Sequence, residues 1–350
     1  MIILRYFTIN LVGALLLAAT VLSIPTNSAS NDKFLAENTT SISTADTSPS
    51  NSLKVLSNNV FFLPEALLNW GQNPYQTPTL GQSRKDWNST SGSYSSLSPV
   101  NGGVVIMSKW PIKEKHQFIY KTGCGSDWFS NKGFIYVVLD YNGANLHVFG
   151  THMQSDDSHC YPGQAAACRA QAMESWRSFL SDRNIPREEL VIFAGDFNID
   201  RNTAEFNSTL TSPHSVSSQE RLNKGGRSGA SEGDPSNSGS SDPSSVAMDQ
   251  VSLHAPDDYE GDASTWTGID NSIAHFSDPK EHNYIDFIFV VENKSPSPVV
   301  QSVVQTALKV HSPAFTIWGQ VYNDYSDHWP ISANIVLKKD PIHQGNTTMA

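Results

Sequence analysis

Residues 190–198 read Leu-Val-Ile-Phe-Ala-Gly-Asp-Phe-Asn, an apolar run that ends in Asp196 and Asn198. A short, continuous apolar run closed by glycine is typical of a strand buried on both faces. Because side chains two residues apart point to the same face of a strand, Asp196 and Asn198 should emerge together where this strand ends. The stretch predicts a buried strand that carries a carboxylate and an amide to one edge of a sheet.

Two other apolar segments carry isolated polar side chains. Residues 148–154, Val-Phe-Gly-Thr-His-Met-Gln, turn polar at His152, where the predicted strand stops. Residues 284–290, Tyr-Ile-Asp-Phe-Ile-Phe-Val, hold Asp286 inside an apolar strand. A buried carboxylate is costly unless it is paired, so we expect Asp286 to contact a polar neighbour in the same site.

An acid and a base are adjacent near the end of the chain, in Ser-Asp-His-Trp-Pro at residues 326–330. Asp327 can bind a divalent cation or orient an imidazole, and His328 is the side chain best suited to move protons near neutral pH. Pro330 and the alternating apolar run at 331–337 place the pair at the start of a strand. Together with the preceding segments, the pair indicates a metal-assisted phosphodiesterase site.

In sequence order, the motifs Thr-His-x-Gln, Gly-Asp-x-Asn, Tyr-Ile-Asp-x-Ile and Ser-Asp-His-x-Pro resemble the endonuclease/exonuclease/phosphatase superfamily, which has the fold of deoxyribonuclease I. Further segments resemble one branch of it, the secreted bacterial-type neutral sphingomyelinases, also called sphingomyelinase C. They lie at residues 69–72, 102–112, 123–125, 130–134 and 322–328. The resemblance covers residues 53–337, with an interruption near 210–255. It implies an α/β fold of four layers, an α/β sandwich.

The resemblance also implies roles for single residues. It assigns stabilisation of the phosphoryl oxygens to His152, and it assigns orientation of the attacking water and contact with the phosphate to Asp196 and Asn198. It gives His328 the role of the base that takes a proton from water. Elementary chemistry agrees, because a base beside a polarised phosphodiester can activate water.

The metal ligands that the resemblance implies are Asn59, at the end of the first core strand, and Asp327. Oxygen and amide ligands suit Mg²⁺ or Mn²⁺ better than zinc. The implied reaction is hydrolysis of sphingomyelin to ceramide and phosphocholine.

One departure from the family pattern concerns its main metal ligand. Family members carry a helix and then a strand with an Asn-Glu pair after the Trp-Gly-Gln segment, but here residues 69–72 lead directly to residues 75–77. We therefore expect one helix and one strand to be absent near residues 72–76, which would leave a sheet with unpaired backbone groups. Glu65 precedes the Trp-Gly-Gln segment, so its position does not match the missing glutamate.

Three alternatives to an active sphingomyelinase follow from this departure and from the superfamily. The chain is a sphingolipid-binding homologue with impaired catalysis, or its sequence is a gene model that lacks an exon, or it is a secreted nuclease. The net charge of −11 argues against the nuclease, because duplex-binding proteins present basic surfaces. We expect no nucleic-acid partner and a monomer.

The partner that we expect is a sphingomyelin-containing membrane, contacted from its surface. Phe315 and Trp318 are the candidate lipid contacts, in a short segment between Ser312 and Tyr322. Strand aromatics of this kind are about as often buried in the protein core.

Several features predict a secreted, extracellular protein. Residues 1–23 carry Arg5 and then an apolar stretch that is short for a membrane span, which is the pattern of a signal peptide. Glycosylation sequons follow at Asn38, Asn88, Asn207, Asn293 and Asn346.

The cysteines fit the same compartment. The resemblance implies a disulfide between Cys124 and Cys160. Cys168 is left over, and from the residues alone it could be buried, reactive or bonded to Cys160 instead.

The predicted organisation is a single domain at residues 53–338, preceded by a disordered leader at 24–52 and followed by a tail at 339–350. Residues 213–247 are a low-complexity loop insertion. An amphipathic helix is predicted from Ala165 to Leu180. Its buried face should consist of Ala166, Ala170, Met173, Trp176 and Leu180.

Overall fold

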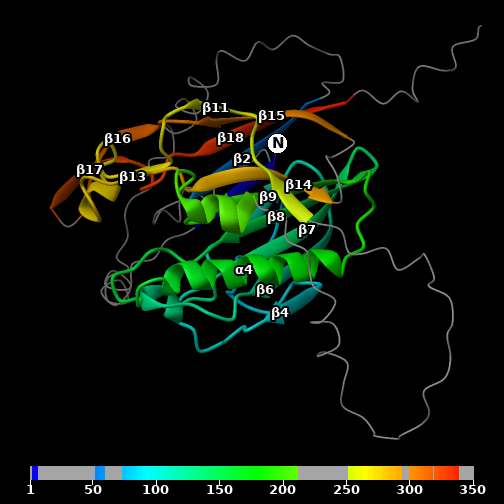
Figure 1. Cartoon of the computed structure of the whole chain (residues 1–350), viewed down its shortest axis with the longest axis horizontal. Helices are drawn as coiled ribbons and strands as arrows, with labels where there is room; N and C mark the ends of the chain where they lie inside the picture. Colours follow the sequence, from blue (N-terminus) through cyan, green and yellow to red (C-terminus); the bar gives the residue numbers. More distant parts are fainter. Residues whose placement is uncertain are drawn as a thin grey trace, which may run out of the picture.

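The computed structural model describes residues 2–6, 52–59, 73–211, 251–293, 299–317 and 319–338. Two seven-stranded sheets face each other across an apolar core, which confirms the predicted α/β sandwich (Figure 1). Within these residues β2 (Ser52–Asn59) packs across the core on β9 (Leu190–Asp196), and β14 (Asp286–Asn293) packs on β18 (Ile331–Leu337). The core lies between the sheets and also on the outer face of one of them, and the polar ends of their strands remain available for a site.

The first sheet has the strand order β10-β14-β9-β8-β7-β6-β4. Its central strands β8 and β9 are parallel, and β14 is antiparallel to β9. The predicted strand at residues 190–196 is confirmed as β9, and all seven of its residues are buried. The bounds are β4 Ser89–Gly92, β6 Ile112–Ile119, β7 Gly133–Tyr141, β8 Ala144–His152, β9 Leu190–Asp196, β10 Val251–His254 and β14 Asp286–Asn293.

The second sheet has the strand order β11-β15-β18-β2-β1-β5-β3. Strand β18 runs antiparallel to β2, so the start of β18 lies beside the end of β2. This arrangement brings the segment before β18, which contains His328, close to Asn59. The bounds are β1 Ile2–Tyr6, β2 Ser52–Asn59, β3 Tyr75–Gln76, β5 Val105–Ser108, β11 Asp258–Gly261, β15 Val300–Ala307 and β18 Ile331–Leu337.

The centre of the second sheet is filled by the first residues of the chain. Strand β1 is parallel to β2 and antiparallel to β5, and its register places Tyr6 opposite Asn59. The expectation that the departure near residues 72–76 leaves unpaired backbone groups in this sheet is therefore wrong. An apolar segment remote in sequence pairs there instead. The same residues belong to the predicted signal peptide, so one molecule cannot both lose that peptide and keep β1.

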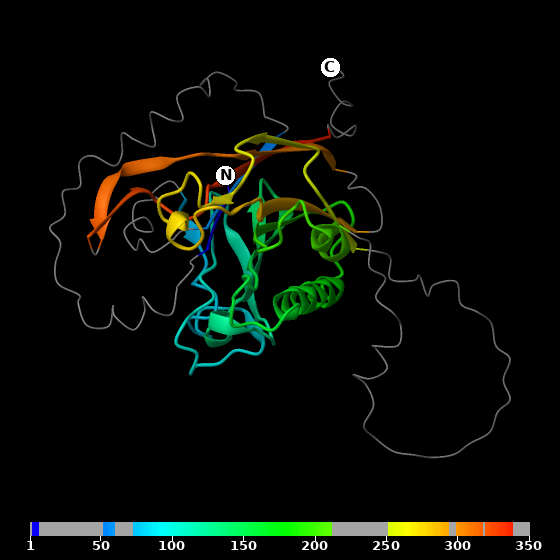
Figure 2. The same cartoon turned by 60° about the vertical axis from the view of Figure 1, so that its left-hand side comes forward.

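Helix α4, Gln164–Ser181, covers the outer face of the first sheet (Figure 2). The ring of Trp176 stacks on that of Phe193 with centroids 4.5 Å apart, which fixes the helix over β9. The predicted helix is confirmed, but its predicted face is partly wrong, because Ala170 is exposed. Arg169 and Arg177 are buried in the same helix, since both find buried hydrogen-bond acceptors.

Small elements complete the described part. The hairpin of β16, His311–Ile317, and β17, Gln320–Asp324, lies at one end of the molecule in both views (Figures 1 and 2). Strands β12 and β13 form a second two-stranded unit. The remaining bounds are β12 Trp266–Thr267, β13 His282–Asn283, and the short helices η1 Gly125–Phe129, η2 Phe206–Thr211 and η3 Ala274–Phe276.

Among the described residues, no helix has the length and apolarity needed to cross a bilayer. Several predictions fall outside these residues. They concern the leader before Ser52, the insertion at 213–247, the tail at 339–350, Glu65 and Trp318.

Candidate active site

Polar residues from five segments meet at one end of the two sheets. Asn59 ends β2, His152 ends β8, Asp196 ends β9, Asp286 begins β14, and His328 lies just before β18. Asp196 is opposite both His152 and Asp286 in the strand register. All five are buried, so the fold assembles a polar cluster inside an apolar structure.

His328 is held by a carboxylate. Its Nδ1 lies 2.8 Å from Asp286 Oδ2, and its Nε2 lies 3.8 Å from Asp196 Oδ2. Burial lowers the pKa of His328, but the negative charges of Asp286, Asp327 and Asp196 outweigh burial and raise it to about 10. The polar partner expected for Asp286 is therefore His328, and that expectation is confirmed.

Asp196 is the hub of the cluster. Its Oδ2 accepts a hydrogen bond of 2.9 Å from Asn59 Nδ2, and its Oδ1 accepts one of 2.8 Å from the Asn198 backbone N–H. Burial raises the pKa of Asp196 to about 7, with a further contribution from the nearby Asp286 carboxylate. Because the carboxylates of Asp196 and Asp286 lie close together, a positive charge between them would be stabilised by both.

His152 is fully buried, and its Nε2 lies 3.6 Å from Asp196 Oδ2. Burial holds the pKa of His152 well below its usual value, and the positive charges of Lys132 and His328 act in the same direction. His152 is therefore neutral near pH 7. A neutral imidazole can donate one hydrogen bond to a phosphoryl oxygen without carrying a charge.

The backbone of Asn198 adopts an unusual conformation. Its φ of 52° lies in the left-handed region, which asparagine tolerates better than most residues. Its side-chain Nδ2 donates a hydrogen bond of 3.1 Å to the carbonyl oxygen of Met153, the residue that follows His152 in the chain. The Gly-Asp-x-Asn segment is thereby tied to the segment that carries His152.

Lys132 is a neighbour of the cluster to which the sequence motifs assigned no role. Its Nζ lies 2.7 Å from Asp127 Oδ2 and 3.0 Å from Met153 O. It supplies a largely buried positive charge that lowers the pKa of His152. The sequence signal was only its place in the segment at residues 130–134.

The sequence motifs also assigned no role to Ser326 and Asn271, because both act through hydrogen bonds to the backbone. The Ser326 hydroxyl contacts the Asn59 carbonyl oxygen, and it accepts the His328 backbone N–H at 3.2 Å. Asn271 Nδ2 donates to Ser326 O at 2.7 Å. These bonds fix the segment of Asp327 and His328 against the end of β2.

Oxygen atoms dominate the part of the cluster that can hold a cation. Asp196, Asp286 and His328 offer ligand atoms within 4.8 Å of one another. Among the residues that the structure describes, no partner hydrogen-bonds to the buried oxygens Asn59 Oδ1 and Asp286 Oδ1, which leaves them available to coordinate. This donor set fits a hard divalent cation. Asp327 is not in this group, and burial raises its pKa.

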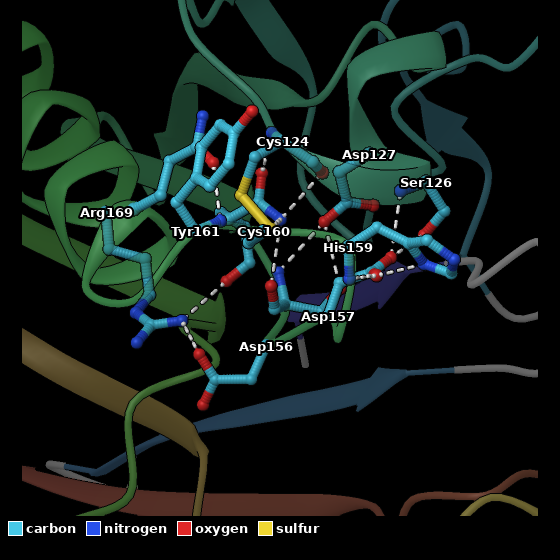
Figure 3. Close-up of a disulfide and its surroundings, with 12 residues drawn as sticks. Cys124, Ser126, Asp127, Asp156, Asp157, His159, Cys160, Tyr161 and Arg169 are labelled. Carbon is cyan, nitrogen blue, oxygen red and sulfur yellow. Dashed lines mark hydrogen bonds and ion pairs between the residues drawn. A yellow bond between two sulfur atoms is a disulfide. The ribbon is translucent and has the colours of Figure 1, made fainter.

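The predicted disulfide between Cys124 and Cys160 is present (Figure 3). Cys168 is free, buried and packed against that disulfide, so the alternative bond between Cys160 and Cys168 is not formed. The Cys124 backbone N–H donates to Gln154 Oε1 at 2.9 Å, which links the disulfide to the segment after His152.

The hairpin carries the described candidate for lipid contact. Phe315 is half-buried and stacks on Tyr322 with ring centroids 5.6 Å apart. Phe276, which is 59% exposed, has its ring centroid 5.6 Å from that of Tyr322. An apolar group is thus accessible at the hairpin, and its contact with lipid stays a prediction.

Known proteins are similar to this chain in sequence and in fold. The profile of the endonuclease/exonuclease/phosphatase family matches residues 26–328. A phospholipase C of Staphylococcus aureus is 38% identical over 262 residues, covering 74% of this chain and 68% of that protein. A sphingomyelinase C of Bacillus cereus is 32% identical over 344 residues, covering 84% and 92%.

Solved structures agree. The crystal structure of sphingomyelinase C from Streptomyces griseocarneus superposes with a TM-score of 0.64 at 29% identity, covering 95% of this chain and 98% of that one. A mutant beta toxin of Staphylococcus aureus with bound magnesium ions has a TM-score of 0.62 at 34% identity, covering 80% and 85%. The chain therefore belongs to the endonuclease/exonuclease/phosphatase family and, within it, to the group of sphingomyelinase C.

Proposed function

We propose that this protein is a secreted sphingomyelin phosphodiesterase, which hydrolyses sphingomyelin to ceramide and phosphocholine with the help of Mg²⁺. Its family makes it a phosphoric diester hydrolase by class. The observation that carries the proposal is the buried cluster of Asn59, His152, Asp196, Asp286 and His328 at the meeting point of the two sheets. The names of the similar proteins supply the substrate class.

The residues of the cluster would divide the work as follows. Asn59 and Asp286 would hold the cation through their free oxygens, with Asp196 beside them. A bound Mg²⁺ polarises the phosphodiester and neutralises developing charge. Without a cation, the surrounding carboxylates keep a proton on His328 near pH 7, and the positive charge of a bound cation would lower its pKa so that this proton is released to solvent. Neutral His328, oriented by Asp286, would then take the proton of the attacking water. Neutral His152 would donate a hydrogen bond to a phosphoryl oxygen.

Asp196 and Asn198 would orient the water and the phosphate. Asp196 Oδ1 already fixes the Asn198 backbone, and Asn198 Nδ2 is anchored on Met153 O. Such fixed groups reduce the reorganisation needed at the moment of reaction. Asp327 remains a proposed additional ligand of the cation. Its carboxylate lies outside the group formed by Asp196, Asp286 and His328, but the residue is next to His328 in sequence.

The proposed cation site has less negative charge than the family pattern implies. The family resemblance implies a glutamate on the strand that is absent near residues 72–76, whereas the strand that pairs with β2 here places Tyr6 opposite Asn59. With one acid fewer, the site should bind Mg²⁺ weakly, because this ion loses its hydration water reluctantly. This same observation favours the second candidate function, a sphingolipid-binding homologue with little turnover.

Secretion and membrane contact are part of the proposal. The disulfide suits an oxidising compartment, where such bonds persist. The hairpin with Phe315 would rest on the membrane surface, as aromatic residues commonly do at the boundary between lipid and water.

One assay distinguishes the two candidate functions. Purified protein is incubated with vesicles of choline-labelled sphingomyelin in a series of Mg²⁺ concentrations, and both vesicle binding and phosphocholine release are measured. Release that rises with Mg²⁺ supports the phosphodiesterase. Vesicle binding without release at any Mg²⁺ concentration supports the binding homologue and contradicts the enzyme.

A further inference from the structure

A buried arginine connects the two loops that carry site residues. Arg169, in helix α4, is almost fully buried. Its Nε and Nη2 donate to the two carboxylate oxygens of Glu205 at 2.7 and 2.8 Å. Its Nη1 donates to Asp156 Oδ1 at 2.8 Å and to Gln154 O at 3.1 Å. Figure 3 shows Arg169 reaching from the helix toward Asp156 beside the disulfide loop.

The partners of this guanidinium lie on both loops. Gln154 and Asp156 follow His152 at the end of β8, whereas Glu205 follows Asn198 after the end of β9. A planar guanidinium with five donors can hold such partners at fixed angles, and a two-point bond to a carboxylate is among the strongest contacts available. Arg169 therefore fixes the position of one loop relative to the other.

The effect reaches the site through one peptide. The Gln154 carbonyl, which Arg169 holds, is adjacent to Met153. Met153 O accepts the hydrogen bond from Asn198 Nδ2, and the Met153 backbone N–H donates to Asp196 O at 3.0 Å. A shift of the segment after His152 would therefore move the acceptor that orients the Asn198 amide.

We infer that Arg169 is a positioning residue for the phosphodiesterase site, because its buried guanidinium locks the segment after His152 and the segment after Asn198 into one arrangement. This inference rests on the proposed function and extends it to a residue outside the cluster. Arg169 acts through Met153 and Asn198, and it is not expected to touch the substrate.

The same helix provides a matched control. Arg177 is as buried as Arg169, but its Nη2 donates a hydrogen bond of 2.7 Å to Thr209 O, in η2. Loss of either arginine removes a buried cation from one helix. Only loss of Arg169 releases the loops that carry site residues.

The test compares Arg169→Met, Arg169→Lys and Arg177→Met with the parent chain. Hydrogen–deuterium exchange is measured on peptides that cover residues 153–157 and 197–203. Exchange should rise in both peptides for Arg169→Met, rise less for Arg169→Lys, and stay at the parent level for Arg177→Met. Unchanged exchange in the Arg169 variants, or an equal rise in Arg177→Met, overturns the inference.

Kinetics on sphingomyelin give a second readout. For Arg169→Met we expect kcat to fall by about 10- to 100-fold with little change in KM, since a small misplacement of a catalytic group costs that much. Arg169→Lys should recover part of this loss, and Arg177→Met should lower kcat less than Arg169→Met, because the Arg177 guanidinium bonds to η2 and not to the segment after His152. If Arg169→Met does not fold, Arg169→Lys decides by the same criteria. If the parent chain has no activity, the proposed function fails, and the exchange data still decide the inference.

Discussion

His328 Nδ1 lies 2.8 Å from Asp286 Oδ2, although the two residues are far apart in sequence and His328 directly follows Asp327. The Asp327 carboxylate instead contacts the Ser326 hydroxyl at 3.3 Å. The acid that orients the histidine therefore comes from a strand of the other sheet. Neighbouring side chains in an extended segment point in different directions, which is why the adjacent acid is not the partner.

The first prediction concerns this pair. His328→Ala should lower turnover by more than 100-fold, within the range of roughly 10²- to 10⁴-fold for removal of a general base. Asp286→Asn should lower it by about 10- to 100-fold, as expected when an orienting partner is lost. Steady-state kinetics on sphingomyelin vesicles measure both. Asp258→Asn, at an exposed edge strand, is the control. Full activity of His328→Ala would remove the histidine from the proposed role.

A second prediction concerns the disulfide. Peptide mapping without reduction should recover Cys124 bonded to Cys160, as in the structure. Replacement of both cysteines by alanine should lower the free energy of unfolding by about 3–4 kcal/mol, because the bond closes a loop with a sequence separation of 36 residues. Urea unfolding measures the difference, with Cys168→Ala as the single-cysteine control. A Cys160–Cys168 peptide in the map would contradict the pairing.

A third prediction concerns pH. Hydrogen bonds to Asp157 from the backbone and side chain of Ser126 and of His159 hold the pKa of this carboxyl far below its ordinary value of 3.8. A depressed pKa means that the ionised acid stabilises the fold above pH 3.8 and that this stabilisation is lost as the pH falls further.

Melting temperatures of the parent chain and Asp157→Asn test this between pH 7 and pH 2. The difference should be largest near neutral pH and should shrink below about pH 4, where an ordinary aspartate is protonated. A difference that is the same at every pH would show that the charge of Asp157 contributes nothing.

A fourth prediction concerns strand β1. Proline at position 3 removes a backbone donor from a strand paired on both sides, so Ile3→Pro should lower the urea midpoint clearly. Ile3→Val keeps the strand preference and should change the midpoint little. If both variants unfold like the parent chain, residues 2–6 do not stabilise the sheet. The predicted signal peptide would then be compatible with the folded domain.

Local patterns predicted the strands that carry the site. The apolar run before Asp196, the polar end at His152 and the single acid in the strand of Asp286 each imply a place at a strand end, and the two-sheet fold brings them together. Helix α4 was predicted as well, but its buried face only in part. Periodicity counts apolar side chains, and it cannot show that Arg169 has acceptors that allow it to be buried while Ala170 is exposed.

The remaining features depend on contacts between distant segments. The pairing of β1 with β2 joins residues 2–6 to residues 55–59, and no local pattern encodes it. The choice of Asp286 as the partner of His328 depends on how the two sheets face each other. Lys132 and Ser326 act through bonds to the backbone, which sequence motifs do not display.

The most direct measurement is release of labelled phosphocholine from sphingomyelin vesicles by the parent chain, in millimolar Mg²⁺ and again with a chelator. A cluster of Asn59, Asp196, Asp286 and His328 without the family's glutamate predicts slow release that stops with the chelator and in His328→Ala. Fast release at low Mg²⁺ would point to a further acidic ligand, with Glu65 the first to replace. Absence of release, or release that the chelator leaves unchanged, would contradict a metal-assisted phosphodiesterase.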